Sequence, residues 1–108
     1  MVKVMNADEK RHVSATVALG CQICRQLGYG ESGSEYHHVR YLGSSGKRAP
    51  HKAGIPLCSA HHRTGGPGVA FHAAPKTFEK LYGTEEELLA QTYEDLGLPF
   101  PDEWRRLT

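Results

Sequence analysis

The first run of hydrophobic and polar positions along the chain predicts a helix near the N-terminus. This helix covers Asn6–Leu19, with acidic residues early and with Val13 and Val17 four positions apart on one face. Gly20 then predicts the end of the helix. The pattern therefore indicates an N-terminal helical flank, residues 1–20, before the first cysteine.

The pattern toward the C-terminus predicts two further helices. One covers Ala74–Tyr82, with Phe78 and Leu81 facing inward and a glycine directly after it. The other begins with a capping box at Thr84 and ends at Gly97. Its predicted apolar face consists of Leu88, Leu89, Tyr93 and Leu96.

Between these helices the side chains predict two short extended segments. The first is Glu35–Leu42, because its tyrosines and valine favour β structure. The second is the Ile-Pro-Leu run at residues 55–57, where Pro56 restricts the strand to a sheet edge or a strand start. Ser59–Arg63 can form a short helical turn, which the following glycines interrupt. The order of elements predicts a small α+β fold.

Length and composition then limit the size of the core. With 108 residues and 39% hydrophobic content, the chain suits one small domain. Such domains bury a modest share of their surface, so a bound metal would help to stabilise this one. We divide it into the helical flank at 1–20, a core at 21–83, and a C-terminal helix and tail at 84–108 that packs on the core through Trp104 and Leu107.

No apolar run could span a membrane and no signal-peptide pattern is present, so we expect a soluble cytoplasmic protein without membrane contact.

The distribution of charge is more informative than the net charge of +1. Between Tyr36 and Phe78 there are six basic residues, six of the seven histidines and no acid, whereas eight acids and three basic residues follow from Glu79 onward. This polarity suits a middle segment that faces DNA, although chance clustering in loops would produce the same pattern. The residues predicted to contact phosphates are Arg40, Lys47, Arg48, Lys52 and Arg63. Phosphate contacts position DNA without reading its sequence, so we expect little sequence preference.

All three cysteines fall in two metal-ligand pairs. Cys21 and Cys24 form one pair and Cys58 and His61 form the other, each at two-residue spacing. Three cysteines cannot all form disulfides, and a tetrahedral structural zinc site takes four such ligands. We therefore predict a structural zinc ion, with buried thiols that hold no metal as the alternative.

Three further histidines lie on the predicted strand or next to a predicted zinc ligand, and the zinc ion does not need them. His37 and His38 are neighbours on the predicted strand, so their side chains would point to opposite faces. His62 follows His61 directly, and the zinc would fix its backbone. The histidines either occupy half-buried surface without a function or form a second site that holds another ion.

The joint pattern resembles that of the HNH nucleases, which have the ββα-metal or His-Me finger fold. In those proteins a histidine pair on a strand is followed by a loop and a Cys-x-x-Cys/His pair with His or Asn directly after it. Here Tyr36-His-His-Val39 and Ile55-Pro-Leu-Cys-Ser-Ala-His-His62 match. The chain is more closely similar to phage recombination-associated nucleases of the Ref type, which share the first Cys-x-x-Cys and a later Gly-x-x-x-His-Ala, here Gly68 to Ala73.

The resemblance implies metal-dependent hydrolysis of DNA phosphodiester bonds. His38 would be the general base that deprotonates the attacking water, and His37 and His62 would hold a catalytic divalent ion. His72 is a candidate third ligand. Magnesium, manganese or a transition metal would serve, and an all-imidazole site favours the last of these. The resemblance also implies a phage or prophage origin in a bacterial host, duplex or single-stranded DNA as substrate, and a recombinase filament as a possible partner.

One departure from the HNH pattern concerns its asparagine. The chain has a single asparagine, Asn6, and it precedes the motif. His51, seven residues before Cys58, is the nearest polar replacement, and it would orient His38 or contact the scissile phosphate. The competing hypotheses are a zinc-binding module that holds nucleic acid or protein without catalysis, and a degenerate nuclease that has kept only binding.

Overall fold

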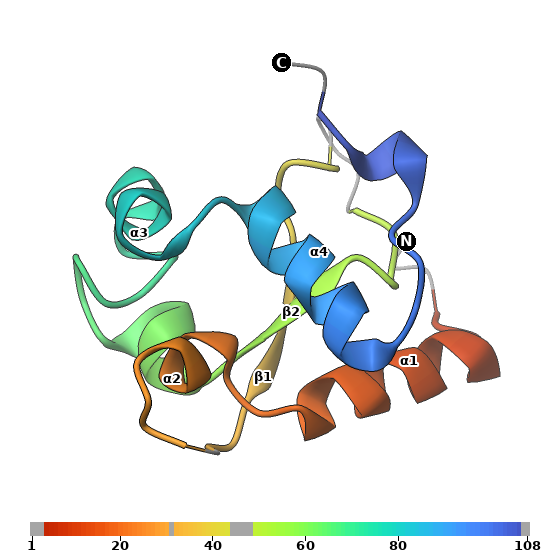
Figure 1. The fold of residues 1–108 in the computed structure, drawn as a ribbon, viewed down its shortest axis with the longest axis horizontal. Helices are drawn as coiled ribbons and strands as arrows, with labels where there is room; N and C mark the ends of the chain where they lie inside the picture. The colour runs from red at the N-terminus through yellow and green to blue at the C-terminus, as the bar shows by residue number, and fades with distance from the viewer. Residues whose placement is uncertain (1–3, 31, 44–48, 107–108) are drawn as a thin grey trace.

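The computed structural model describes residues 4–30, 32–43 and 49–106, so Lys47, Arg48 and Leu107 lie outside the described residues. In the described part, helices surround a small two-stranded sheet (Figure 1). The elements in chain order are α1 (Ala7–Ala18), α2 (Gln22–Gln26), β1 (Glu35–His38), β2 (Gly54–Leu57), η1 (Ala60–Thr64), α3 (Pro75–Tyr82), α4 (Glu85–Leu96) and η2 (Asp102–Trp104). The predicted mixture of helix and short strand is confirmed.

The two strands pair antiparallel, with Glu35 opposite Leu57 and His38 opposite Gly54. The prediction of a strand as far as Leu42 is wrong, because β1 ends at His38. The backbone N–H groups of Arg40 and Tyr41 donate to the carboxylate of Glu85, at 2.8 to 3.1 Å, instead of to a neighbouring strand. A side chain from a distant helix therefore ends the strand.

Both longer helices begin with a reciprocal side-chain cap, although only the cap at Thr84 was predicted from the sequence. At α1, the side chain of Asn6 accepts from the backbone of Glu9, and the Glu9 side chain accepts from the backbone of Asn6. At α4, Thr84 and Glu87 form the same reciprocal pair, and Gly97 ends the helix in the left-handed conformation. The capping box predicted at Thr84 and the helix end predicted at Gly97 are confirmed, and the cap at Asn6 lies at the predicted start of α1.

One predicted inward-facing residue of α3 is exposed. Phe78 is buried, as predicted, but Leu81 is 58% exposed. Tyr82 takes the inward position instead, because its ring packs 4.9 Å from that of Phe78 and its hydroxyl donates to the carbonyl of Gly68. The amphipathic face of this short helix is thus formed by residues four apart, not three.

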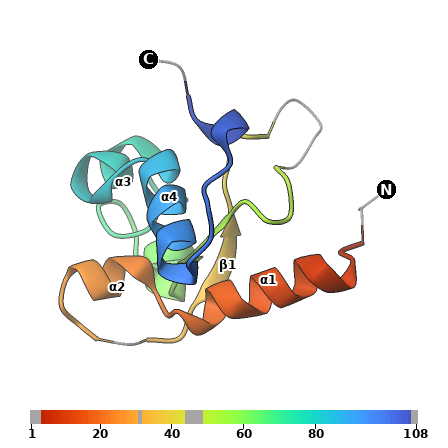
Figure 2. The same ribbon diagram turned by 45° about the vertical axis from the view of Figure 1, so that its right-hand side comes forward.

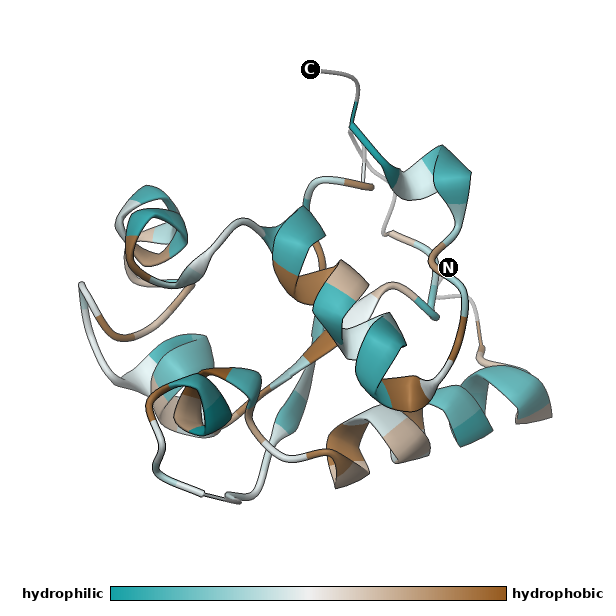
Figure 3. Ribbon diagram, viewed as in Figure 1, coloured by the Kyte–Doolittle hydropathy of each residue, from teal (hydrophilic) through white to brown (hydrophobic). Residues whose placement is uncertain are grey.

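The core lies between the sheet and the helices that contact it. Helices α1, α2 and α4 all contact β2, whose four residues are buried (Figure 2). The core also takes in apolar residues of α4, and Figure 3 shows that hydrophobic residues of α1 gather toward its C-terminal end. Trp104 in the tail packs against the Tyr93 ring, at 5.6 Å between centroids, and so contacts the core. Within the described part of the chain, no helix has the length and apolar character that a membrane span requires.

Candidate metal centres

The first cluster consists of the four residues predicted to hold zinc. Cys21 and Cys24 lie at the start of α2, where the Cys21 thiol also accepts from the backbone N–H of Cys24 at 3.4 Å. Cys58 directly follows β2, and His61 lies in the first turn of η1. The short helix and the end of the strand therefore bring together two pairs that are far apart in sequence, within one group that could hold a metal ion.

The distances within this group fit a tetrahedral zinc ion. Cys24 Sγ lies 3.8 Å from Cys58 Sγ, and His61 Nδ1 lies 3.6, 3.6 and 3.2 Å from the sulfurs of Cys21, Cys24 and Cys58. For Zn–S bonds of about 2.3 Å, tetrahedral geometry separates two sulfurs by roughly 3.8 Å. The four measured distances, 3.2 to 3.8 Å, are therefore close to the edge lengths of such a tetrahedron.

The electrostatics of the group also suit a bound cation. Burial raises the pKa of the Cys21 thiol to about 11, so this side chain would be a neutral thiol without a positive charge beside it. Burial lowers the pKa of His61, which favours the neutral imidazole that binds metals. A cation such as Zn²⁺ would compensate the burial of thiolates here, and this cluster is a candidate zinc site.

A second cluster is formed by three histidines from three segments. His37 lies on β1, His62 on η1 and His72 on the turn before α3, and one ring nitrogen from each lies within 4.8 Å of the other two. The Nε2 atoms of His62 and His72 are 3.1 Å apart, which is about the separation of two ligands on one ion. This geometry brings together all three residues predicted to hold a catalytic ion.

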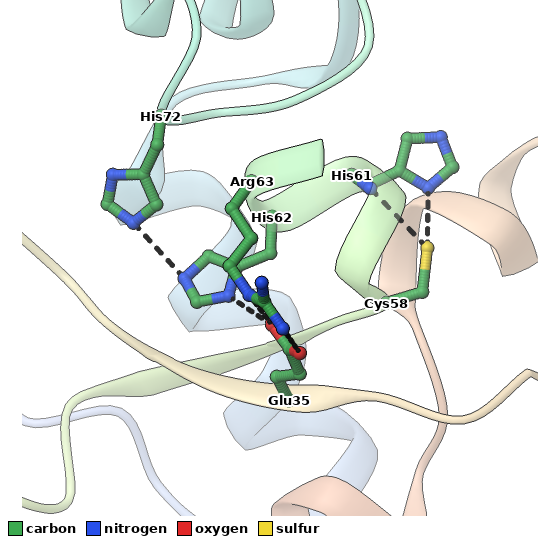
Figure 4. Close-up of polar contacts among 6 residues, drawn as sticks. All are labelled: Glu35, Cys58, His61, His62, Arg63 and His72. Atoms are coloured by element: carbon green, nitrogen blue, oxygen red, sulfur yellow. Dashed lines mark hydrogen bonds and ion pairs between the residues drawn. The ribbon is translucent and has the colours of Figure 1, made fainter. Parts of the chain in front are cut away.

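Two backbone hydrogen bonds place His72 in this cluster. The N–H of Phe71 donates to the carbonyl of His61 at 2.8 Å, and the N–H of His72 donates to that of His62 at 3.1 Å. The residues after the glycine-rich turn are therefore held alongside η1. Figure 4 shows the His72 ring reaching down to His62, while His61 points away toward Cys58.

A carboxylate stands behind each of two histidines in the second cluster. Glu35 Oε1 lies 2.8 Å from His62 Nδ1, and Glu85 Oε2 lies 2.7 Å from His37 Nε2. When the imidazoles donate in these bonds, the other ring nitrogens, His62 Nε2 and His37 Nδ1, each keep a lone pair that can bind an ion. Carboxylates behind histidine ligands in this way fix the tautomer and make the imidazole more basic.

Both carboxylates are held in the charged form. Hydrogen bonds from Arg63 and His62 lower the pKa of Glu35 to about 2. Burial raises the pKa of Glu85, but hydrogen bonds from His37 and from the backbone of Arg40 outweigh it, so the pKa lies below the usual value. Burial, together with the nearby His37 and His62, lowers the pKa of His72. The cluster thus combines a histidine, His72, whose neutral form is favoured with two carboxylates, Glu35 and Glu85, that are held in the charged form.

His38 lies on the other face of β1 from His37, as strand alternation predicts. Its Nε2 is 3.4 Å from Nδ1 of His51, at the long end of the hydrogen-bonding range. Tyr36 packs edge-on against the His38 ring, at 5.1 Å between centroids, and donates its hydroxyl to the carbonyl of His51. The two predicted catalytic histidines therefore lie together, and Tyr36 contacts both residues.

Comparison with known protein families agrees with this arrangement of residues. The model of one family, described as recombination enhancement, RecA-dependent nuclease, matches residues 5–97. The chain belongs to this family. The match includes the three histidines of the second cluster, the His38–His51 pair and all four candidate zinc ligands. It confirms the resemblance to recombination-associated nucleases of the Ref type, and the family name indicates a nuclease that acts in recombination.

For a nuclease of this family, the predicted phosphate contacts differ in their surroundings. Arg40 is exposed and its guanidinium lies 6.0 Å from the Phe71 ring. Arg63 makes two hydrogen bonds to Glu35, at 3.0 and 2.6 Å, and Lys52 pairs with Asp8. Of these three side chains, that of Arg40 alone has no carboxylate partner among the described contacts, so we expect its guanidinium to be the most available for a phosphate.

The sequence did not point to Glu35 or Glu85. Glu35 is two residues before His37, so the period of a strand places both on one face, and this spacing could have indicated it. Glu85 is 48 residues from His37. Its place after a capping residue suggested only a helix start, and no pattern in the sequence links it to the strand.

Proposed function

We propose that this protein is a metal-dependent DNA endonuclease of the HNH type, with a zinc-stapled ββα-metal core. The observation that carries the proposal is the second cluster, in which His37, His62 and His72 converge and two of them are backed by carboxylates. A structural zinc module needs none of these three histidines. In this proposal β1, β2 and η1 correspond to the two strands and the helix of the ββα-metal fold.

The residues of the second cluster would bind the catalytic divalent ion. When bound, the ion supplies positive charge to a phosphate oxygen and to the leaving 3′ oxygen as negative charge develops. Glu85 holds the His37 ring and Glu35 holds the His62 ring, so two ligands are oriented before any ion arrives. Three nitrogen ligands favour a transition metal such as zinc, iron or nickel over magnesium and manganese.

His38 would act as the general base. It accepts the proton of the attacking water, the water oxygen forms a bond to phosphorus, and the bond to the 3′ oxygen breaks. His51 takes the place of the missing asparagine and orients the His38 ring through their 3.4 Å contact. Within the described residues β1 pairs with β2 along one edge, and a DNA strand that follows the other edge would reach both faces of β1.

The family name adds a dependence on RecA, which suggests the form of the substrate. We propose that the protein acts on DNA carrying a recombinase filament, in the cytoplasm of a bacterial host, and that a phage or prophage encodes it. The basic residues that contact DNA would bind phosphates and give little sequence preference.

Cleavage of supercoiled plasmid by wild type and His38→Ala tests the proposal. Each protein is incubated with magnesium, manganese or EDTA, on naked DNA and on DNA coated with recombinase. The proposal predicts metal-dependent nicking by wild type and a loss of roughly 100-fold or more in His38→Ala, as for other general bases. Equal activity of the two proteins would reject His38 as the base. Failure of both to cut either substrate, with zinc still bound, would favour a non-catalytic zinc module.

A further inference from the structure

An open cleft lies beside the second histidine cluster. It has a volume of about 630 Å³, and the residues that line it include Arg40, Tyr41, Phe71, Lys76, Glu85 and Arg106. Two of these residues connect it directly to the histidines, since Glu85 bonds to His37 and Phe71 precedes His72. A molecule in the cleft would therefore lie near the three histidines, on the side of His37 that faces Glu85.

Three positive side chains from distant parts of the chain meet at this cleft. Arg40 follows β1, Lys76 lies in the first turn of α3, and Arg106 comes from the C-terminal tail. All three are exposed, and no ion pair involving them is present among the described residues. Arg106 belongs to the acidic C-terminal part of the sequence, so its place beside the basic segment emerges only from the fold.

The cleft also carries aromatic surface, and its three positive side chains outnumber its two carboxylates, Glu79 and Glu85. The Arg106 guanidinium lies 4.6 Å from the Tyr41 ring centroid, and that of Arg40 lies 6.0 Å from Phe71. Glu85 lines the cleft, but both of its carboxylate oxygens already accept hydrogen bonds from His37 and from the backbone of Arg40 and Tyr41. Basic groups beside aromatic rings are typical of surfaces that hold a nucleic-acid strand.

We propose that this cleft is a subsite for one nucleotide of the DNA strand, next to the phosphate that is cut. Lys76 and Arg106 would contact backbone phosphate, and Tyr41 would offer a face to the base or sugar. The volume falls within the about 300–1,000 Å³ typical of pockets for small molecules, so it can accommodate a nucleotide unit. The inference rests on the proposed nuclease function and assigns DNA contacts to two residues outside the predicted phosphate-binding set.

The salt dependence of DNA binding tests this subsite with a matched pair of variants. Lys76→Gln with Arg106→Gln removes two charges from the cleft. Lys80→Gln with Arg105→Gln removes two exposed charges from the same helix and the same tail, and neither of these residues lines the cleft. Affinity for a labelled oligothymidine is measured over a range of salt, on zinc-loaded protein without added divalent ion. Zinc content and thermal melting check that both variants fold.

The slope of log affinity against log salt should fall by about 1.4 in the cleft variant, because each lost phosphate contact removes roughly 0.7 for single strands. The control variant should keep the wild-type slope. Equal slopes in the two variants would overturn the subsite, and Lys76→Gln against Lys80→Gln repeats the comparison if the double variant does not fold. A defect only on recombinase-coated DNA would also overturn it, since the cleft would then bind an acidic protein surface.

The two proposals can fail separately in this experiment. If wild type cuts plasmid while the cleft variant binds DNA like its control, the nuclease stands and the subsite is wrong. If wild type neither cuts nor binds DNA, the proposed function fails and the subsite fails with it.

Discussion

Adjacent histidines in this protein belong to different sites. His37 and His38 point to opposite faces of β1 because side chains alternate along a strand. His61 and His62 diverge because successive residues of a helix point in different directions, so one ring meets Cys58 and the other meets Glu35 (Figure 4). Each pair thereby contributes one residue to the three-histidine cluster and one residue to another group.

The carboxylate of Glu35 links His62 to Arg63, and the two bonds have different consequences. Glu35→Gln removes the charge behind His62, so we expect the affinity of the three-histidine cluster for Mn²⁺ to fall by about 10- to 100-fold. Arg63→Gln keeps the bond between Glu35 and His62 and should have a much smaller effect. Isothermal titration of zinc-loaded protein measures both, and an equal loss in the two variants would contradict this role of Glu35.

Some functional side chains were predictable from the sequence and others were not. Ligand type and spacing were enough to predict the group Cys21/Cys24/Cys58/His61, whereas the group His37/His62/His72 was predicted from the resemblance to a known family. Glu85 and Arg106 could not be found in this way. Their roles depend on how α4 and the tail pack against β1, and no local pattern encodes that packing.

At the scale of elements, the sheet depends on a close approach between the two strands. Gly54 pairs with His38, and a Cβ on Gly54 would lie 2.0 Å from the ring of Tyr36. Tyr36 in turn packs against His38 and bonds to His51. The absence of a side chain at residue 54 therefore leaves room for the ring that packs against the candidate base.

Gly54→Ala should destabilise the fold by about 1–3 kcal/mol, because the ring of Tyr36 must move. It should also disturb His38 and lower cleavage. Gly33→Ala is the matched control, since a Cβ there meets nothing within 4 Å and the backbone is not left-handed. Chemical denaturation of both zinc-loaded variants measures the difference. A Gly54→Ala protein as stable as Gly33→Ala would contradict the packing described.

The predicted cap at Thr84 located a helix start correctly, whereas β propensity predicted too long a strand for β1. Asn6 and Thr84 mark helix starts because the cap is a local interaction between residues three apart. The end of β1 is set instead by Glu85, which takes the backbone donors of Arg40 and Tyr41. The exposure of Leu81 likewise reflects the position of Tyr82 against the core, which the helical period alone did not predict.

At the scale of the whole molecule, the zinc cluster joins the first and middle parts of the chain. Cys21 and Cys24 are fixed to α2, and Cys58 and His61 connect β2 to η1. The same short helix carries His62, so a metal ion held by Cys58 and His61 would also set the position of a residue in the second cluster. We therefore expect the structural metal to be needed for the three-histidine cluster to form.

Removal of the structural metal with a strong chelator should unfold the domain. Metal binding to such sites provides about 10–16 kcal/mol of apparent free energy, which is comparable to the whole stability expected of a domain this size. Circular dichroism before and after chelation, and after zinc is restored, measures the loss and recovery of helix. A spectrum unchanged by complete metal removal would contradict the structural role of the cluster.

The most direct test of two separate metal centres is a metal count combined with plasmid cleavage in His62→Ala and His61→Ala. We predict that His62→Ala retains one tightly bound zinc and its fold but loses the second ion and cleavage. His61→Ala should lose the tightly bound zinc and the fold together. Loss of the tight zinc in His62→Ala, or cleavage by that variant at the wild-type rate, would contradict the assignment of the two clusters.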